Sequence, residues 1–182
     1  MEYLTIVWNS LEAMIAVGFG LAARSIALVG FGLDSLVEVF AASVVVWELR
    51  GVSEERERRA LRLIALSFFA LAAYVTVEAV RDLVVRAEAS ESVPGIVLAA
   101  ISLIIMPLLA LGKNRTGHQM GNQALIADSK ETLLCSYLSV VLLVGLLLNA
   151  TVGWWWADPV AGLGIAYLAG REGLDAWRTE GA

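Results

Sequence analysis

Two pairs of potential metal ligands stand four residues apart in strongly apolar surroundings. Asp34 and Glu38 form the first pair, and Glu131 and Cys135 form the second. Residues at i and i+4 lie on one face of a helix, a turn apart, so each pair can present two donors in the same direction. Two such helices would supply four ligands, the number that a tetrahedral divalent ion needs. Carboxylates with one thiolate suit Zn²⁺ or a similar ion better than Mg²⁺ or Ca²⁺.

A weak internal repeat links the two pairs. A shift of 97 residues places the first pair on the second, and it also places Ser35 on Thr132. Matched polar positions in two apolar segments are typical of a transporter site near the middle of the membrane. The repeat therefore predicts that the two pairs face a common site.

The elements that must carry these pairs are membrane spans. Of the 182 residues, 59% are hydrophobic and 17% are charged, whereas soluble domains have about 45–50% and 25%. The apolar residues gather into runs, most of them close to the ~20 residues of a helical span. The runs are 3–23, 25–49, 60–80, 93–111, 123–150 and 159–170. We predict an all-α membrane protein, with a single six-helix transmembrane domain over residues 1–182.

The same composition excludes several other classes of protein. The net charge is −5, so no basic surface is left for nucleic acid. The single cysteine excludes a disulfide framework. No nucleophile–base pair or phosphate-binding loop is present, so we expect neither an enzyme nor a bound cofactor beyond the transported metal. The first run begins without Lys or Arg and lacks a small-residue cleavage site, which indicates a first span and not a signal peptide.

The basic residues predict the orientation. Nine of them flank one side of the predicted bundle and three flank the other, so the positive-inside rule puts both termini in the cytoplasm. Tryptophans 154–156 fall on the opposite side, where indole rings favour the headgroup region. We expect a multi-pass protein of a bacterial-type cytoplasmic (inner) membrane. The nine are Arg50, Arg56, Arg58, Arg59, Arg62, Lys113, Arg115, Arg171 and Arg178, and the three are Arg24, Arg81 and Arg86.

Four acids inside the predicted spans need an explanation: Asp34, Glu38, Asp128 and Glu131. Each charge near a span centre costs about 2.5–3.5 kcal/mol. Protonation, a lysine partner or a bound cation could offset that cost. Two readings follow: a transported metal ion, or a non-transporting membrane scaffold or regulator in which Lys130 completes a structural ion-pair network.

Other polar residues could line the ion path or support the ligands. Asn9 and Glu12 lie in the first run, and Asp128 and Lys130 lie beside the second pair. Hydrogen bonds between helices, or an Asp128–Lys130 salt bridge, would also explain them. The only histidine, His118, falls in the polar, glycine-rich stretch 112–123, which we expect to be a flexible and solvated loop.

Asp158 stands directly before Pro159 at the start of the last run, where a carboxylate is expected to cap the helix that follows.

Two segments resemble motifs of the cation diffusion facilitator family. Residues 25–38, SIALVGFGLDSLVE, resemble its second span, in which a Ser-x-Ala-Leu stretch leads to a [His/Asp]-x-x-x-Asp pair. Residues 127–136, ADSKETLLCS, are similar to the fifth-span motif Ala-Asp-x-x-His-x-x-x-Asp. The stretches YVTVEAVRDL and IIMPLLALGKNRTG agree as well. The resemblance covers nearly the whole chain and implies six helices, a homodimer and divalent metal transport in exchange for protons.

The chain departs from that family pattern at three places. Phe31 replaces an aspartate of the second span, and Glu131 and Cys135 replace the fifth-span histidine and aspartate. About a dozen residues follow Gly170, so we expect no C-terminal cytoplasmic domain, as in a membrane-domain-only branch such as the transmembrane protein 163-like cation transporters.

The metal ligands that we expect are Asp34, Glu38, Glu131 and Cys135, and the ion that fits them best is Zn²⁺. The same fold carrying Fe²⁺, Mn²⁺ or Cd²⁺ remains open, because affinities and geometries overlap among these ions.

Overall fold

The computed structural model describes the backbone of residues 2–48, 54–120 and 123–180, and the side chains of residues 3–44, 46, 62–63, 65–119, 129 and 132–178. All regular structure in these ranges is helical, which confirms the predicted all-α class with six helices. The helices are α1 (Glu2–Ala23), α2 (Ile26–Glu48), α3 (Glu54–Val85), α4 (Val93–Met120), α5 (Gln123–Val152) and α6 (Ala157–Glu180).

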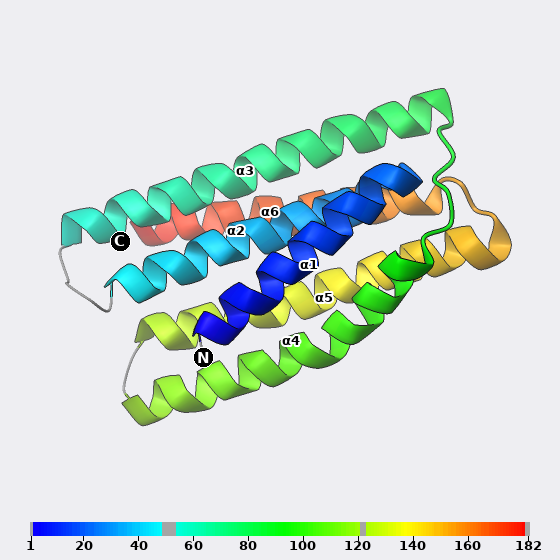
Figure 1. The fold of residues 1–182 in the computed structure, drawn as a ribbon. Coiled ribbons are helices and arrows are strands. Elements are labelled where there is room, and N and C mark those ends of the chain that lie inside the picture. The colour runs from blue at the N-terminus through cyan, green and yellow to red at the C-terminus, as the bar shows by residue number, and fades with distance from the viewer. Residues whose placement is uncertain (1, 49–53, 121–122, 181–182) are drawn as a thin grey trace.

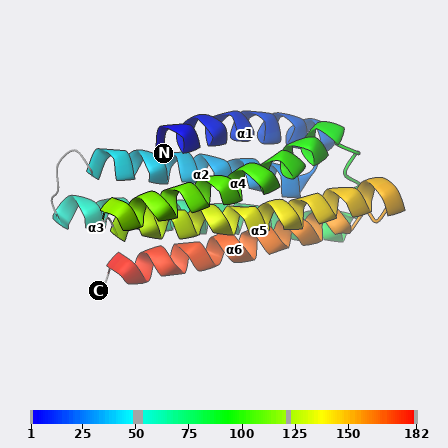
Figure 2. The ribbon, with the colours of Figure 1, turned by 90° about the horizontal axis from the view of Figure 1, so that it is seen from below.

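The six helices form one elongated bundle in which successive helices run in opposite directions (Figure 1). The first turn of α1 and the last turn of α6 lie at the same end of the bundle as the last turns of α2 and α4 and the first turns of α3 and α5, and we call this the near end. The α1–α2, α3–α4 and α5–α6 connections lie at the far end. Seen from below, α1 and α6 lie on opposite sides of the bundle (Figure 2). An even number of antiparallel spans thus returns the chain to the side on which it began.

Helix α2 occupies the middle of the bundle. The closest pairs are α1 with α2, α4 with α5 and α3 with α6, and α2 also contacts α3, α5 and α6. Gly32 lets α1 approach, because a Cβ there would lie 2.9 Å from the Cβ of Ala16. Gly145 does the same between α5 and α6, where a Cβ would lie 2.6 Å from the Cβ of Ala161. Small residues at such crossings are typical of membrane helices.

Within the described residues, four helices contain a stretch that is long and apolar enough to cross a membrane. These stretches are Tyr3–Ala23, Ile26–Val44, Val93–Gln119 and Thr132–Val152. Large apolar side chains also face outward, as Leu4, Met14 and Leu21 do on α1 with exposed fractions of 60%, 65% and 64%. An apolar exterior of this kind suits contact with lipid, so the chain is an integral, multi-pass membrane protein.

The structure corrects one expectation for the near end. The polar stretch 112–120, which we expected to be a flexible loop, forms the last turns of α4, and His118 is an exposed residue of that helix. Contacts with α5 explain the extension. The Lys113 side chain is fully buried and its Nζ lies 3.0 Å from Thr132 Oγ1, while Asn114 Nδ2 lies 3.2 Å from Ser129 Oγ.

The turn between α1 and α2 fixes where α2 begins. Arg24 adopts a left-handed conformation, with φ of 55°. The Ser25 N–H donates to the Gly20 carbonyl at 2.9 Å, and the Arg24 N–H donates to the Leu21 carbonyl at 3.3 Å. This pair of bonds is the Schellman arrangement that ends many helices. Because α2 follows at once, its first acidic residue, Asp34, lies about two turns into the bundle.

Candidate metal centre

Three of the predicted ligands meet between α2 and α5. The Cys135 Sγ lies 3.1 Å from Asp34 Oδ2 and 2.5 Å from Glu38 Oε1. All three side chains are buried, with exposed fractions of 5%, 2% and 8% for Cys135, Asp34 and Glu38. The two residues that the internal repeat pairs, Glu38 and Cys135, are therefore in direct contact. We refer to these three residues as the α2–α5 cluster.

Asn9 of α1 contacts this cluster. Its Nδ2 donates to Glu38 Oε2 at 2.5 Å, so each Glu38 oxygen has a partner. The Asn9 Oδ1 is buried and has no hydrogen-bond partner among the described residues. Asn9 thus forms a hydrogen bond between helices, and its partner is an expected ligand. The two roles that we considered for it, a bond between helices and support of a ligand, are therefore the same contact.

A cavity of about 20 Å³ adjoins the cluster. Asp34, Glu38 and Cys135 line it, together with Glu172 of α6. That volume is enough for one water molecule, and hence for one small ion. Glu172 was not among the predicted site residues, because it follows the last predicted run, 159–170, whereas α6 continues through it to Glu180.

The described residues do not form a ready-made metal site. Over the part of the chain that the structure describes, no group of three or more His, Cys, Asp or Glu side chains is arranged to hold an ion. The thiol instead lies between the two carboxylates and can share its single proton with them. Binding a metal ion would require that proton to leave and the donors to turn toward the cavity.

The second expected pair is described only in part. The side chains of Asp128, Lys130 and Glu131 lie outside the described residues, although their backbone belongs to α5. Glu131 precedes Cys135 by four residues and so occupies the same face of α5. Its role as a ligand, and those of Asp128 and Lys130 near the ion path, remain predictions.

A buried lysine lies one helical turn toward the near end. Lys113 of α4 donates from Nζ to Thr132 Oγ1 at 3.0 Å. Its ammonium is close enough to Glu38 to interact with that carboxylate electrostatically. Lys113 was predicted to flank the bundle on the cytoplasmic side. Nothing in its polar, glycine-rich stretch indicates that one of the side chains points inward.

Glu12 lies in a second polar cluster, between α1, α2 and α4. Ser35 Oγ donates to Glu12 Oε2 at 2.8 Å, and Ser102 Oγ donates to Glu12 Oε1. Exposed fractions are 1%, 2% and 0% for Glu12, Ser35 and Ser102. The structure therefore brings Glu12 to α2 but gives it partners other than the expected ligands. Ser102 was not anticipated, whereas Ser35 had a signal in its match with Thr132.

Asp158 binds the N-terminus of a helix other than its own. Its Oδ1 accepts from Ser25 Oγ at 2.5 Å, and its Oδ2 accepts from the Ile26 N–H at 2.9 Å. The Ala27 N–H is 3.5 Å from the same Oδ2. The expectation that Asp158 caps α6 is wrong: α6 begins beside the first turn of α2, whose N–H groups need acceptors.

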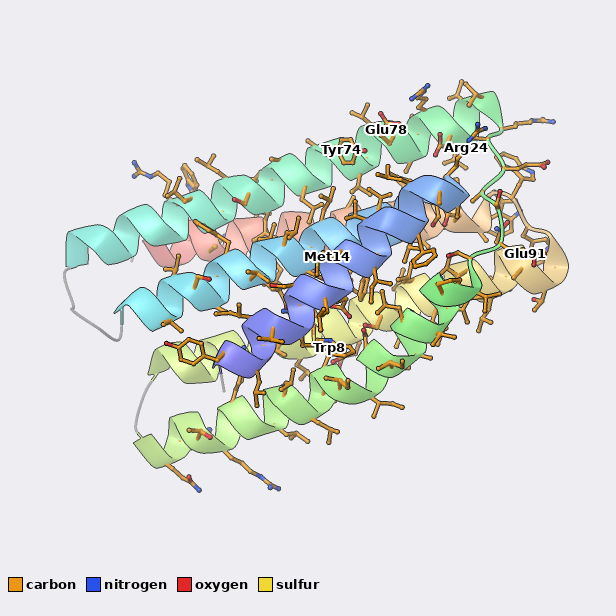
Figure 3. The ribbon with its side chains drawn as sticks, viewed as in Figure 1. Trp8, Met14, Arg24, Tyr74, Glu78 and Glu91 are labelled. Carbon is orange, nitrogen blue, oxygen red and sulfur yellow. The ribbon has the colours of Figure 1, made fainter. Side chains whose placement is uncertain are left out.

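A larger pocket of about 370 Å³ opens toward the far end. On its wall, Arg24 lies near the far end in Figure 3, whereas Glu78 and Tyr74 lie nearer the middle of the bundle. Arg81 Nη1 lies 3.1 Å from Glu78 Oε2. Partial burial raises the pKa of the Asp82 carboxyl, and the nearby charge of Glu78 raises it further, although Arg81 opposes both.

Bundle and cluster together define a class of protein: a polytopic membrane protein with buried carboxylate and thiol donors at mid-bundle. Residues 62–179 match the family model described as the cation efflux transmembrane domain. The chain therefore belongs to the cation diffusion facilitator family, whose members are cation transporters. This finding confirms the predicted family, and the matched range includes the second motif segment, residues 127–136.

A curated relative supports the same assignment. An uncharacterized transporter from Methanocaldococcus jannaschii is 25% identical over 185 residues, which cover 94% of this chain and 64% of the relative. The chain thus spans somewhat less than two thirds of the length of that protein.

Proposed function

We propose that the chain exports a divalent transition metal ion, Zn²⁺ in the first place, and takes up protons in exchange by alternating access. The observation that carries the proposal is the contact of the Cys135 thiol with both acids of α2. Two carboxylates and a thiol match the ligand chemistry of Zn²⁺. Glu131, one turn before Cys135, would be the fourth ligand.

The chemistry of the donors supplies the coupling. An incoming ion needs an ionised thiolate and ionised carboxylates, so binding releases protons. When the site faces a compartment with less metal and more protons, protons take the same lone pairs and the ion leaves. In this mechanism Asp34 and Glu38 bind the ion, Cys135 loses its proton to water and binds the ion as a thiolate, and Asn9 holds the Glu38 carboxylate toward the site.

The setting follows from the family and the charge distribution. We propose that residues 1–182 act as one six-helix membrane domain, that two copies form a homodimer, and that the near end faces the cytoplasm. The lipid surroundings would be those of a bacterial-type cytoplasmic membrane. The excess of basic residues near the predicted loops of that side supports the orientation.

Reconstitution tests the proposal. Purified protein in liposomes should take up Zn²⁺ when a pH gradient is imposed, and the double variant D34A/E131A should lose this uptake. Ser67→Ala is a suitable control, because Ser67 Oγ is exposed and donates only to the Leu63 carbonyl of its own helix at 2.9 Å. Equal uptake by wild type and the double variant would overturn the assignment.

A second candidate function is a non-transporting scaffold or regulator. It is favoured by the observation that the described donors bond to one another and do not surround an ion. A protein of that kind would purify without metal, and Zn²⁺, Co²⁺, Fe²⁺ or Cd²⁺ would leave its thermal stability unchanged. For a transporter, competition among Zn²⁺, Fe²⁺, Mn²⁺, Co²⁺ and Cd²⁺ in the flux assay would identify the cargo.

A further inference from the structure

Glu12 is a buried carboxylate that the proposed metal site does not use. It is 1% exposed, and both of its oxygens accept hydrogen bonds from serine hydroxyls of other helices. These partners are the neutral hydroxyl groups of Ser35 of α2 and Ser102 of α4, and the neutral Trp8 side chain of α1 also interacts with the carboxyl group. A buried acid held in this way must either carry a proton or stay charged with neutral donors, and an isolated buried charge is expensive.

The partners of Glu12 fit both of its protonation states. Ser35 Oγ lies 2.8 Å from Glu12 Oε2 and also 3.1 Å from the Phe31 carbonyl oxygen. When Glu12 is ionised, the Ser35 hydroxyl can donate to it. When Glu12 is protonated, its O–H can donate to Ser35 Oγ, and the serine proton turns to the Phe31 carbonyl. The change requires the rotation of one hydroxyl group and leaves no buried donor or acceptor unpaired.

Glu12 is mechanically connected to the proposed metal site. Ser35 directly follows Asp34 in α2, so a change at the Glu12–Ser35 bond acts on the residue next to an expected ligand. Asn9 lies one turn from Glu12 on α1 and donates to Glu38 at 2.5 Å. Among the described residues of the helices packed on α1, Asp34 and Glu38 of α2 interact electrostatically with Glu12, and Lys113 of α4 interacts with Glu38.

We propose that Glu12 is a proton-binding site separate from the metal ligands. It binds one proton when the ion leaves, because the double positive charge that favoured its ionised form from the neighbouring site is then gone. It releases that proton when the next ion arrives. In this step one O–H bond of a hydronium ion breaks as one O–H bond forms on a Glu12 oxygen, and release of the proton to water is the reverse. The inference rests on the proposed metal transport.

Proton and metal movements measured together test this site. Liposomes that contain the wild-type protein and an internal pH dye give the number of protons moved per Zn²⁺ ion. In Glu12→Gln this ratio should fall by about one proton, whereas the dissociation constant for Zn²⁺ should change less than about threefold. Ser10→Ala is the matched control on the same helix, because Ser10 Oγ donates only to the Ile6 carbonyl at 2.6 Å.

The outcomes separate this inference from the function on which it rests. An unchanged ratio in Glu12→Gln, or a loss of Zn²⁺ binding in that variant, overturns the proton site while wild-type flux still supports transport. Absence of Zn²⁺ flux in the wild type would instead remove the proposed function. If Glu12→Gln does not fold, infrared difference spectra of the wild type and of Ser102→Ala, recorded with and without Zn²⁺, test the proton site instead. A protonated carboxyl band that disappears with Zn²⁺ should shift in Ser102→Ala, and no shift would overturn the proposal.

Discussion

Helix α2 meets buried carboxylates in two places, and the two arrangements differ in how completely they are hydrogen-bonded. At the far end, Asp158 accepts hydrogen bonds from the Ser25 hydroxyl and the Ile26 N–H, and the Ala27 N–H lies near the oxygen that binds Ile26. In the middle of the helix, Asp34 and Glu38 share one thiol, and Asn9 adds one amide. Both places are almost fully buried.

The difference shows that burial alone does not identify a functional acid. Backbone N–H groups at a helix start supply Asp158 with donors that an ion cannot improve on, so the carboxylate holds two helices together. A thiol has one weakly donating proton to divide between two acids, so the α2–α5 cluster has lone pairs to spare for a cation. The number of available donors therefore favours a structural role for Asp158 and supports the proposed ion binding at the α2–α5 cluster.

The largest effect is expected when one carboxylate of the α2–α5 cluster is neutralised. Asp34→Asn should lower Zn²⁺ flux at least about 100-fold, because it removes a negatively charged ligand. Its thermal stability without metal should stay the same or rise, because a buried repulsive charge is lost. Flux in liposomes and thermal unfolding in detergent measure the two effects. A large fall in stability would show that Asp34 is structural, as Asp158 is.

The converse variant, Asp158→Ala, should behave in the opposite way. Its loss leaves the Ser25 hydroxyl and the Ile26 N–H without their acceptor, while the Leu28 N–H keeps Ser25 Oγ. The stability of the folded protein should fall by about 2–3 kcal/mol. Zn²⁺ flux per folded molecule should stay close to that of the wild type. Ser25→Ala, which removes one of the donors, should have a smaller effect of the same kind. Unchanged thermal unfolding in both variants would contradict the capping role.

A milder change should alter selectivity and leave transport in place. Cys135→Ser replaces the soft sulfur donor with oxygen at the centre of the cluster. The preference for Zn²⁺ or Cd²⁺ over Mn²⁺ should fall by about tenfold, because thiolates favour the softer ions. Competition in the flux assay measures this preference. An identical metal profile would mean that Cys135 does not touch the transported ion.

The smallest effect is expected in the turn before the Asp158 contact. Arg24 has φ of 55°, a conformation that costs a non-glycine residue about 1 kcal/mol. Arg24→Gly should therefore raise stability by roughly 0.5–1 kcal/mol and leave the Zn²⁺ flux unchanged. A shift in the thermal midpoint of unfolding would report it. A change in flux would show that the far end does more than hold the helices together.

Local sequence patterns predicted much of this fold and of its central cluster. Apolar runs indicated six helices because lipid forces each span to satisfy its own backbone. The four-residue spacing and the 97-residue shift placed Glu38 opposite Cys135, which the structure brings within 2.5 Å. The sequence alone suffices for these two predictions, because the apolar runs and the four-residue spacing are both properties of single helices.

Tertiary contacts account for what the sequence patterns missed. Lys113 is buried against Thr132, so α4 continues through residues that look like a loop. Asp158 caps α2 because α6 starts beside it, and no pattern within the last run reveals that neighbour. The serine partners of Glu12 come from two other helices, and a serine in an apolar run is unremarkable until its neighbour is known.

The fastening of the far end has a mechanical consequence. Besides the Asp158 contact, the Ser90 N–H donates to the Ala23 carbonyl at 2.8 Å and Asn149 Nδ2 donates to the Ala89 carbonyl at 2.9 Å. These bonds hold the helix ends together at the far end, so the helices can tilt relative to one another mainly about this point, which acts as a pivot. A tilt of a few degrees about that pivot moves the opposite tips of helices ~36 Å long by several ångström. We therefore expect the route by which the ion enters to widen through tilting of the helices, with the largest displacement of the helices at the near end.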